Sequence, residues 1–256
     1  MSAEPPFVSV VTVVKNAAGS IADTITSVSV QTYPHREHVI VDGVSTDGTL
    51  DIIRANRDKI ARLVSEPDAG LYHAMNKGIA MATGDVIGYL NSDDFYTDPD
   101  VIADVARVMQ DPAVDACYGD LLYVRPEDLD AVVRYWRSRD YQPGLVERGW
   151  MPAHPTFFIR RRILEEVKGF DARFRYQADY ELMVRLFAVR GIRTRYIPRV
   201  LVKMRMGGHT NRSLRNVIRG NLEAYRACRI NGIAVSPLFI VKKIASRLPQ
   251  FLSRPT

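Results

Sequence analysis

The sequence contains no uninterrupted apolar run of the ~18 residues that a membrane-spanning helix requires. Its two cysteines, Cys117 and Cys228, have neither CxxC spacing nor the spacing of a metal site, so we expect free, reduced thiols. No secretory signal is visible, because Glu4, Pro5 and Pro6 precede the first apolar segment. These absences argue against membrane-spanning, secreted and disulfide-stabilised proteins, and we expect a cytoplasmic protein.

Two common nucleotide-binding motifs are missing as well. Without GxGxxG or GxxxxGK[ST], a dinucleotide-binding Rossmann domain and a P-loop lose their main support. Acidic residues are scarce towards the end of the chain, where twelve Lys or Arg from Arg199 onward accompany one carboxylate, Glu223. This asymmetry predicts a slightly acidic body and a basic tail that meets an anionic partner, either nucleic acid or a membrane surface.

The first half of the chain alternates strand and helix patterns. Strand patterns occupy 8–14, 38–41, 62–65, 86–90 and 113–118. Helical patterns occupy 18–31, 49–56, 72–83 and 101–109. Such alternation predicts an α/β fold with a mainly parallel central sheet flanked by helices. In the second half we expect a strand at 154–159, helices at 160–167, 178–189, 211–228 and 237–248, and a less regular segment at 124–155.

Polar residues follow the predicted parallel strands. Asn16 comes after the first strand, Asp42 after the second, and Asp93 and Asp94 after the apolar stretch 86–90. These strand ends meet at one edge of a parallel sheet, where open α/β sheets bind ligands. Two adjacent carboxylates repel each other, and a divalent cation is the usual remedy. The alternative is that the pair only caps the next segment.

Several segments in order resemble the family-2 glycosyltransferases with the GT-A fold, of the type found in bacterial polysaccharide and glycolipid biosynthesis. The segments are 8–12 with Asn16, 41–49, 66–78, 82–85 and 91–94. The resemblance is strongest over residues 7–120 and continues weakly to about residue 210. It implies a GT-A catalytic domain at 1–210, with a nucleotide-sugar half at 7–120 and an acceptor half at 121–210. Residues 211–256 would then form a basic helical extension.

The resemblance also implies how the acidic pair is used. Asp94 would bind Mg²⁺ or Mn²⁺ directly, and Asp93 would contact the ribose or the metal. A bound cation would neutralise the diphosphate leaving group. His209, in a glycine-containing segment, would either add a metal ligand or lie in an ordinary loop.

The donor nucleotide would lie against other residues of the same half. By resemblance, Asp42 would accept a hydrogen bond from the nucleobase, with Asp68 beside the same pocket. Lys77 would reach the diphosphate as a point charge. Thr12 and Asn16 complete the expected nucleotide-sugar site. The alternatives are a turn at Asp42, a loop residue at Asp68 and a solvated lysine.

An inverting transfer needs a base for the acceptor hydroxyl. Asp179, at the start of the 178–189 helix, matches the family position, although Ala178 replaces the acidic residue that often precedes it. The alternatives are that Asp179 only stabilises its helix through the macrodipole, or that Glu181 is the base. His154 resembles a position on the acceptor side, where a structural role is the other interpretation.

The tail contains a basic amphipathic segment, 237–252. Its apolar side consists of Leu238, Val241, Ile244, Ala245, Leu248 and Leu252. Lys242, Lys243 and Arg247 occupy much of the other side, which suits the surface of an anionic membrane. The alternative is a helix packed on the catalytic domain. Nucleic acid is not expected as a partner, because a binding module and interleaved stacking aromatics are absent.

Together these features predict a metal-dependent, inverting glycosyltransferase. It would move one sugar from a nucleotide-diphosphate sugar to a hydroxyl of a glycan or lipid-linked glycan. The alternatives are a nucleotidyltransferase acting on sugar phosphates and an inactive glycan-binding relative. The first would need a basic, Gly-rich N-terminal loop, which residues 15–19 match poorly, and the second would lack the acidic pair or the base.

Overall fold

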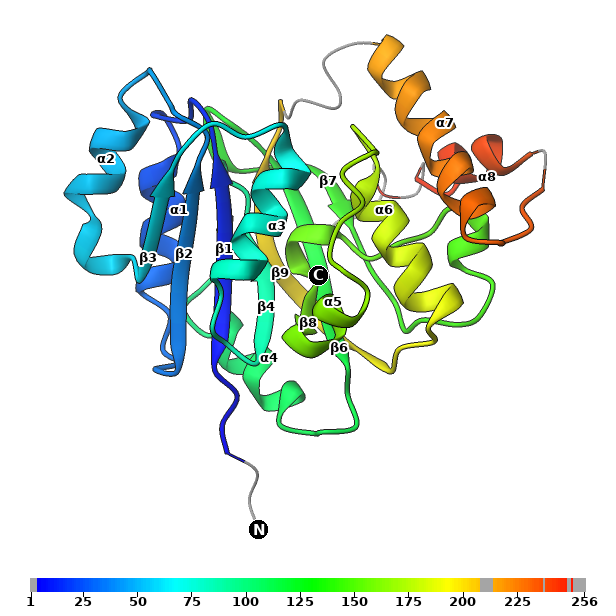
Figure 1. The fold of residues 1–256 in the computed structure, drawn as a ribbon, viewed down its shortest axis with the longest axis horizontal. Coiled ribbons are helices and arrows are strands. Elements are labelled where there is room, and N and C mark those ends of the chain that lie inside the picture. The colour runs from blue at the N-terminus through cyan, green and yellow to red at the C-terminus, as the bar shows by residue number, and fades with distance from the viewer. Residues whose placement is uncertain (1–3, 208–213, 237, 248–249, 251–256) are drawn as a thin grey trace.

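A nine-stranded sheet forms the centre of the computed structural model (Figure 1). The structure describes residues 4–207, 214–236, 238–247 and 250. The strand order is β3-β2-β1-β4-β8-β6-β9-β5, and β7 pairs with β6 outside this path. The strands are β1 (Val8–Val14), β2 (Arg36–Asp42), β3 (Arg62–Ser65), β4 (Val86–Tyr89), β5 (Asp94–Tyr96), β6 (Ala116–Arg125), β7 (Asp128–Trp136), β8 (Phe158–Arg160) and β9 (Thr194–Arg205).

Helices cover both faces of this sheet (Figure 1). They are α1 (Ile21–Ser29), α2 (Thr49–Ala55), α3 (Leu71–Met81), α4 (Val101–Met109), α5 (Arg161–Glu166), α6 (Ala178–Met183), α7 (Leu214–Ile230) and α8 (Phe239–Ala245). A π-helical turn, Val184–Val189, continues α6. No helix in these described ranges is long and apolar enough to cross a bilayer.

The first four strands pair in parallel, as the sequence predicts. β1 lies between β2 and β4, with Val8 opposite both Arg36 and Val86. Every residue of β1 is buried, since α3 packs on one face and α1 on the other. The carboxyl ends of β1, β2 and β4 therefore lie at one edge of the sheet.

The second half of the sheet combines parallel and antiparallel pairs, so the predicted parallel pairing is uninterrupted only in β3-β2-β1-β4. There β8 runs antiparallel to β4 and β6, and β5 runs antiparallel to β9, while β6 and β9 are parallel. The segment 124–155, expected to be irregular, contains the hairpin strand β7. Most of β7 is half-buried or exposed, so its sequence lacks a clear apolar alternation.

The tail helices pack on the rest of the protein. α7 contacts α6, and α8 contacts both α7 and the 3-10 turn Val146–Arg148. Phe239 and Lys243 of α8 are each only 1% exposed. The side of α8 that carries Leu238, Val241 and Ile244 remains exposed. One face of the tail is thus packed on the domain and another faces solvent.

Close packing of α3 on β1 depends on Gly78. A Cβ atom at Gly78 would lie 2.3 Å from Cγ1 of Val11, a stiff β-branched side chain in the central strand. We therefore expect Gly78→Ala to lower the free energy of unfolding by about 1–3 kcal/mol through overpacking. Gly19→Ala is the control, because no atom lies within 4 Å of its Cβ position. Urea denaturation measures both, and equal stabilities would show that β1 yields to the added methyl group.

Candidate functional site

The loops that follow β1 and β2 are tied together at the carboxyl edge of the sheet. Asn16 accepts a hydrogen bond from the backbone N–H of Thr46 (2.8 Å) and donates its own backbone N–H to the Ser45 hydroxyl (2.9 Å). Asp42 is fully buried and accepts hydrogen bonds from the hydroxyls of Ser45 (2.5 Å) and Ser65 (2.6 Å). The structure thus brings Asn16 and Asp42 together, with Asp42 also fixing its loop.

Thr12 does not reach this edge. Its side chain is fully buried, and its hydroxyl shares a hydrogen bond with Nε2 of His38 (2.9 Å). Burial lowers the pKa of His38 to about 3, so this ring is neutral in the folded protein at ordinary pH. The structure therefore places Thr12 in the core rather than among the site residues that the sequence predicts.

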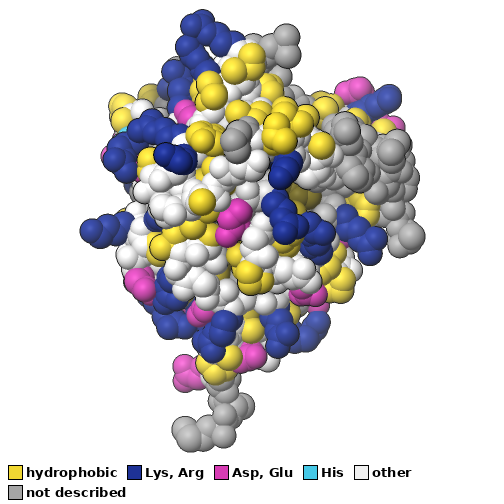
Figure 2. All heavy atoms as spheres, turned by 90° about the vertical axis from the view of Figure 1, so that its right-hand side faces the viewer, with side chains coloured by type: hydrophobic (Ala, Val, Ile, Leu, Met, Phe, Trp, Pro, Cys, Tyr) yellow, Lys and Arg dark blue, Asp and Glu magenta, His cyan; other side chains and the backbone are white. Residues whose placement is uncertain are grey.

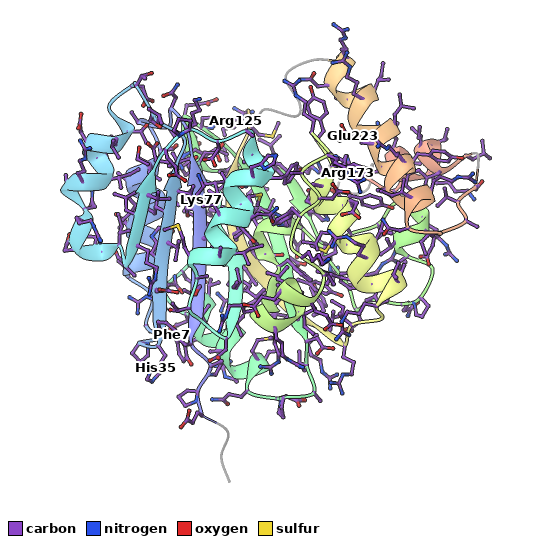
Figure 3. All side chains as sticks on the ribbon, in the orientation of Figure 1. Phe7, His35, Lys77, Arg125, Arg173 and Glu223 are labelled. Carbon is purple, nitrogen blue, oxygen red and sulfur yellow. The ribbon has the colours of Figure 1, made fainter. Side chains whose placement is uncertain are left out.

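Lys77 and Asp68 form one charged group beside α3, at the place labelled by Lys77 in Figure 3. The Lys77 ammonium lies 2.6 Å from an Asp68 oxygen and 2.6 Å from a Glu66 oxygen. These hydrogen bonds raise the pKa of Lys77. The other Asp68 oxygen is buried and has no hydrogen-bond partner among the described residues. The expected phosphate-binding lysine is thus held between two carboxylates.

The acidic pair lies at the start of β5, where Asp94 is fully buried. One Asp94 oxygen accepts a hydrogen bond from the Asn91 amide (2.7 Å), and the other has no partner in the described part of the chain. Burial, followed by the charge of Asp93, raises the pKa of Asp94 well above its usual value. Arg205 opposes this effect and donates to the backbone carbonyl of Asp93 (2.8 Å).

A buried carboxylate oxygen without a partner fits a cation ligand. The described residues hold no cluster of three His, Cys, Asp or Glu side chains suited to a metal. Mg²⁺ usually needs fewer than three protein ligands, because one or two carboxylates, water and substrate phosphates complete its coordination shell. Asp94 and Asp93 therefore suit a cation that arrives with a phosphate ligand. His209 lies outside the described residues.

Asp179 occupies the first turn of α6 and is half-buried. One of its oxygens accepts the Tyr72 hydroxyl (3.5 Å) and the backbone N–H of Tyr180 (2.8 Å). Glu181 instead is 2% exposed and is paired with Arg185 at 2.8 Å. Of the two carboxylates, Asp179 is the one with the freedom to meet a ligand.

An aromatic cluster packs beside Asp179. Tyr89 stacks on His154 (5.3 Å between ring centroids), and Phe170 contacts Tyr89, His154 and Tyr72. Burial lowers the pKa of His154 and the charge of Asp179 partly opposes this, so the two lie within electrostatic range. The Tyr89 hydroxyl is buried without a partner among the described residues. His154 is thus next to Asp179, in a wall of rings.

The charges of both acidic groups act on Tyr123 of β6. Burial raises its pKa, and the charges of Asp94 and Asp179 raise it further, while Arg134 and Arg247 lower it. Both carboxylates therefore lie within electrostatic range of one phenol. The strand-end pair and the start of α6 are far apart in the sequence, yet the fold brings both within this range of Tyr123.

Two tail residues that the sequence did not reveal support the start of α6. Glu223 of α7, labelled in Figure 3, accepts backbone N–H groups of residues 175–177 at 2.8–3.2 Å. The Lys243 ammonium of α8 donates to the Gln177 side chain (2.8 Å) and lies 4.6 Å from the centroid of the Tyr180 ring. Glu223 carried one signal, since it is the sole carboxylate in the basic tail. Lys243 carried no such signal, because the sequence does not distinguish a lysine that becomes buried from its solvated neighbours.

Comparison with known proteins gives consistent matches. The family model described as glycosyl transferase family 2 matches residues 9–174. A PGL/p-HBAD biosynthesis glycosyltransferase of Mycobacterium bovis is 31% identical over 212 residues, which cover 80% of each chain. A mannosyltransferase of Pyrobaculum calidifontis, solved with GDP-Man and Mn²⁺, has a TM-score of 0.66 at 24% identity and covers 94% of this chain and 69% of its own. S. aureus TarS with UDP-GlcNAc has a TM-score of 0.65 at 17% identity, covering 95% and 72%.

From the burial of Asp94 we predict an effect on stability. A carboxyl with a raised pKa destabilises the folded state once the pH exceeds its ordinary value, because the unfolded chain ionises more readily. Asp94→Asn removes this cost. We therefore expect the free energy of unfolding of the metal-free variant to be about 1 kcal/mol higher at pH 8 than that of the unaltered chain. Urea denaturation without metal measures this, with the exposed Asp51→Asn as the matched control. A loss of stability would mean that the unpaired oxygen is favourably solvated.

Proposed function

This chain belongs to glycosyl transferase family 2 and has the GT-A fold, and from this premise we propose its reaction. It transfers one sugar from a nucleotide-diphosphate sugar to a hydroxyl of a glycan or lipid-linked glycan. The observation that supports this proposal is that Asp94, with a buried oxygen that lacks a partner among the described residues, and Asp179, at a helix start, both lie within electrostatic range of Tyr123. An acidic pair and a separate base are the two groups that such a transfer requires.

On the donor side, Asp94 and Asp93 hold Mg²⁺ or Mn²⁺ in this proposal, with diphosphate oxygens and water as the remaining ligands. The bound cation would neutralise the charge that develops on the diphosphate. Mn²⁺ is present in the structure of the Pyrobaculum mannosyltransferase, which supports this choice. Arg205, already bonded to the backbone of Asp93, keeps the pair in place.

The nucleotide lies across the loops of β1 and β2 in this proposal. Asp42 accepts a base N–H with its remaining lone pairs, and Asn16 holds the facing loop. Asp68 and Lys77 belong to the same nucleotide-sugar half of the chain, residues 7–120. A diphosphate near Lys77 would compete with Asp68 and Glu66 for its three N–H donors.

On the acceptor side, Asp179 takes the proton of the attacking hydroxyl, and the sugar carbon inverts as the diphosphate leaves from the opposite face. The Tyr72 hydroxyl donates to Asp179 and so fixes one oxygen, leaving the other for the acceptor. Burial and the charge of Asp179 keep Tyr72 protonated, since they raise its pKa well above 10.0. His154 and Tyr89 form the wall beside the base.

The other two functions that the sequence left open have less support. The family match and a poorly matching loop at 15–19 both weigh against a nucleotidyltransferase. An inactive relative would lack the base or the acidic pair, and this chain has both.

A lipid-linked acceptor would give the tail a use. Figure 2 views the side of the molecule that carries α7 and α8, where apolar side chains gather among Lys and Arg side chains. The exposed apolar residues of the two helices are Val217, Ile218, Leu222, Ile230, Leu238, Val241 and Ile244. A basic surface with an apolar centre suits an anionic bilayer. We infer that the tail brings the enzyme to the membrane that holds its acceptor.

A donor panel tests the reaction. With Mn²⁺, we expect one or a few sugar nucleotides to bind and to be hydrolysed slowly in calorimetric and product-release assays. Asp179→Asn should keep the donor Kd within about 2-fold while transfer falls by about 10²–10⁴, because only proton removal is lost. The exposed Asp58→Asn is the control. If no sugar nucleotide binds with or without metal, the proposed reaction is wrong, and full turnover by Asp179→Asn would assign the base elsewhere.

Vesicle flotation tests the membrane surface. Replacing Leu238, Val241 and Ile244 by Ser should lower partitioning onto phosphatidylglycerol vesicles by at least about 10-fold, because each side chain buries several CH₂ groups at ~0.8 kcal/mol apiece. Val30→Ser with Val189→Ser is the matched control, since both valines are exposed on other elements. Equal partitioning of the two variants and the unaltered chain would remove the membrane role.

A further inference from the structure

A concave surface lies between the end of β7 and α8. It is a pocket of about 840 Å³, lined by residues 135–140, by Leu145 and residues 148–151, by Tyr196, and by residues of α8 and the turn after it. None of the residues placed around the donor lines it. The role of this pocket is therefore separate from the binding of the nucleotide and the metal.

Positive charge dominates the pocket. Arg137, Arg139 and Arg148 contribute from one wall, Lys242 and Arg247 come from the other, and Asp140 is the single carboxylate that lines it. Among the described residues, Arg139, Arg148 and Arg247 form no salt bridge, unlike most arginines of the body, such as Arg199. Guanidinium groups that lack carboxylate partners suit phosphate, which they bind through paired N–H donors.

Aromatic rings form the floor of the same pocket. Trp150 is held in place by Tyr118 and Tyr141, at 6.0 and 6.1 Å between ring centroids. Trp136 carries the Arg134 guanidinium 5.2 Å from its ring centroid. Rigid rings beside a few polar groups form the usual lining of a small-molecule site. The pocket thus offers an apolar platform next to an anion-binding wall.

The pocket lies next to residues that support the segment leading into α6. Arg247 lines the pocket and also lowers the pKa of Tyr123, the phenol whose pKa the charges of Asp94 and Asp179 raise. Gly149, another lining residue, has no room for a Cβ atom, which would lie 2.6 Å from Cβ of Lys243. Lys243 in turn holds Gln177, two residues before the base.

We propose that this pocket binds the acceptor, and that the acceptor carries a phosphate group next to a sugar ring. The ring lies on the tryptophan platform and the phosphate lies against the guanidinium groups of Arg139, Arg148 and Arg247. The inference rests on the proposed glycosyl transfer, because it names the class of acceptor that Asp179 deprotonates. Both a soluble sugar phosphate and a lipid-linked sugar phosphate have this chemistry.

The chain provides its own probe, since Trp136 and Trp150 are its only tryptophans. Titration with glucose 1-phosphate should change the tryptophan emission saturably, whereas uncharged methyl glucoside at the same concentrations should not. Arg139→Gln with Arg148→Gln should weaken the apparent affinity at least 10-fold. Arg54→Gln, an exposed arginine on α2, should leave it unchanged and serves as the control.

Two further arms separate the outcomes. Asp94→Asn should keep the response to glucose 1-phosphate while losing Mn²⁺-dependent binding of sugar nucleotides, which distinguishes the pocket from the donor site. Emission that responds to phosphatidylglycerol vesicles but not to glucose 1-phosphate would make the wall a lipid contact and overturn the acceptor site. No response to glucose 1-phosphate, or an equal response in the double variant, would also overturn it. Donor binding in that case would still support the proposed reaction. A response to glucose 1-phosphate without any donor binding would refute the reaction and leave the phosphate-binding pocket standing.

Discussion

The fold depends on the burial of β1 between two parallel neighbours. All seven of its residues are buried, so its register with β2 and β4 cannot slip without moving apolar side chains out of the core. That register places Asn16, Asp42 and the acidic pair at the same edge of the sheet. The position of these polar residues is therefore a consequence of core packing, to which Gly78 contributes because α3 must approach β1 closely.

The unfavourable burial of charge is concentrated at the candidate site. Asp94 is buried beside Asp93, with one oxygen unpaired among the described residues and its pKa raised. A structure built only for stability would place an apolar or amide side chain there. Arg205 reduces the cost without removing it, because its hydrogen bond goes to the backbone of Asp93. This unfavourable arrangement is what a divalent cation and a diphosphate would relieve.

The tail supports the segment that leads into α6 and is more than an appendage. Glu223 holds the backbone that leads into α6, and Lys243 holds Gln177 from the opposite helix. The same α8 helix contributes Lys242 to the basic pocket and leaves Val241 exposed to solvent. A helix that contacts the base-bearing turn on one side and a membrane surface on another would couple acceptor delivery to catalytic geometry.

The sequence by itself determined the features that depend on neighbouring residues. Periodicity and strand-end polar residues predicted β1, β3 and α4 at their observed bounds, and the ordered motifs identified the family. Only the tertiary structure decided the mixed half of the sheet, the burial of Thr12 against His38, and the support of Asp179 by the tail. Strands such as β9 and contacts such as Glu223 to residues 175–177 join segments far apart in the chain. Local patterns do not encode them, because their stabilisation comes from partners that only folding brings together.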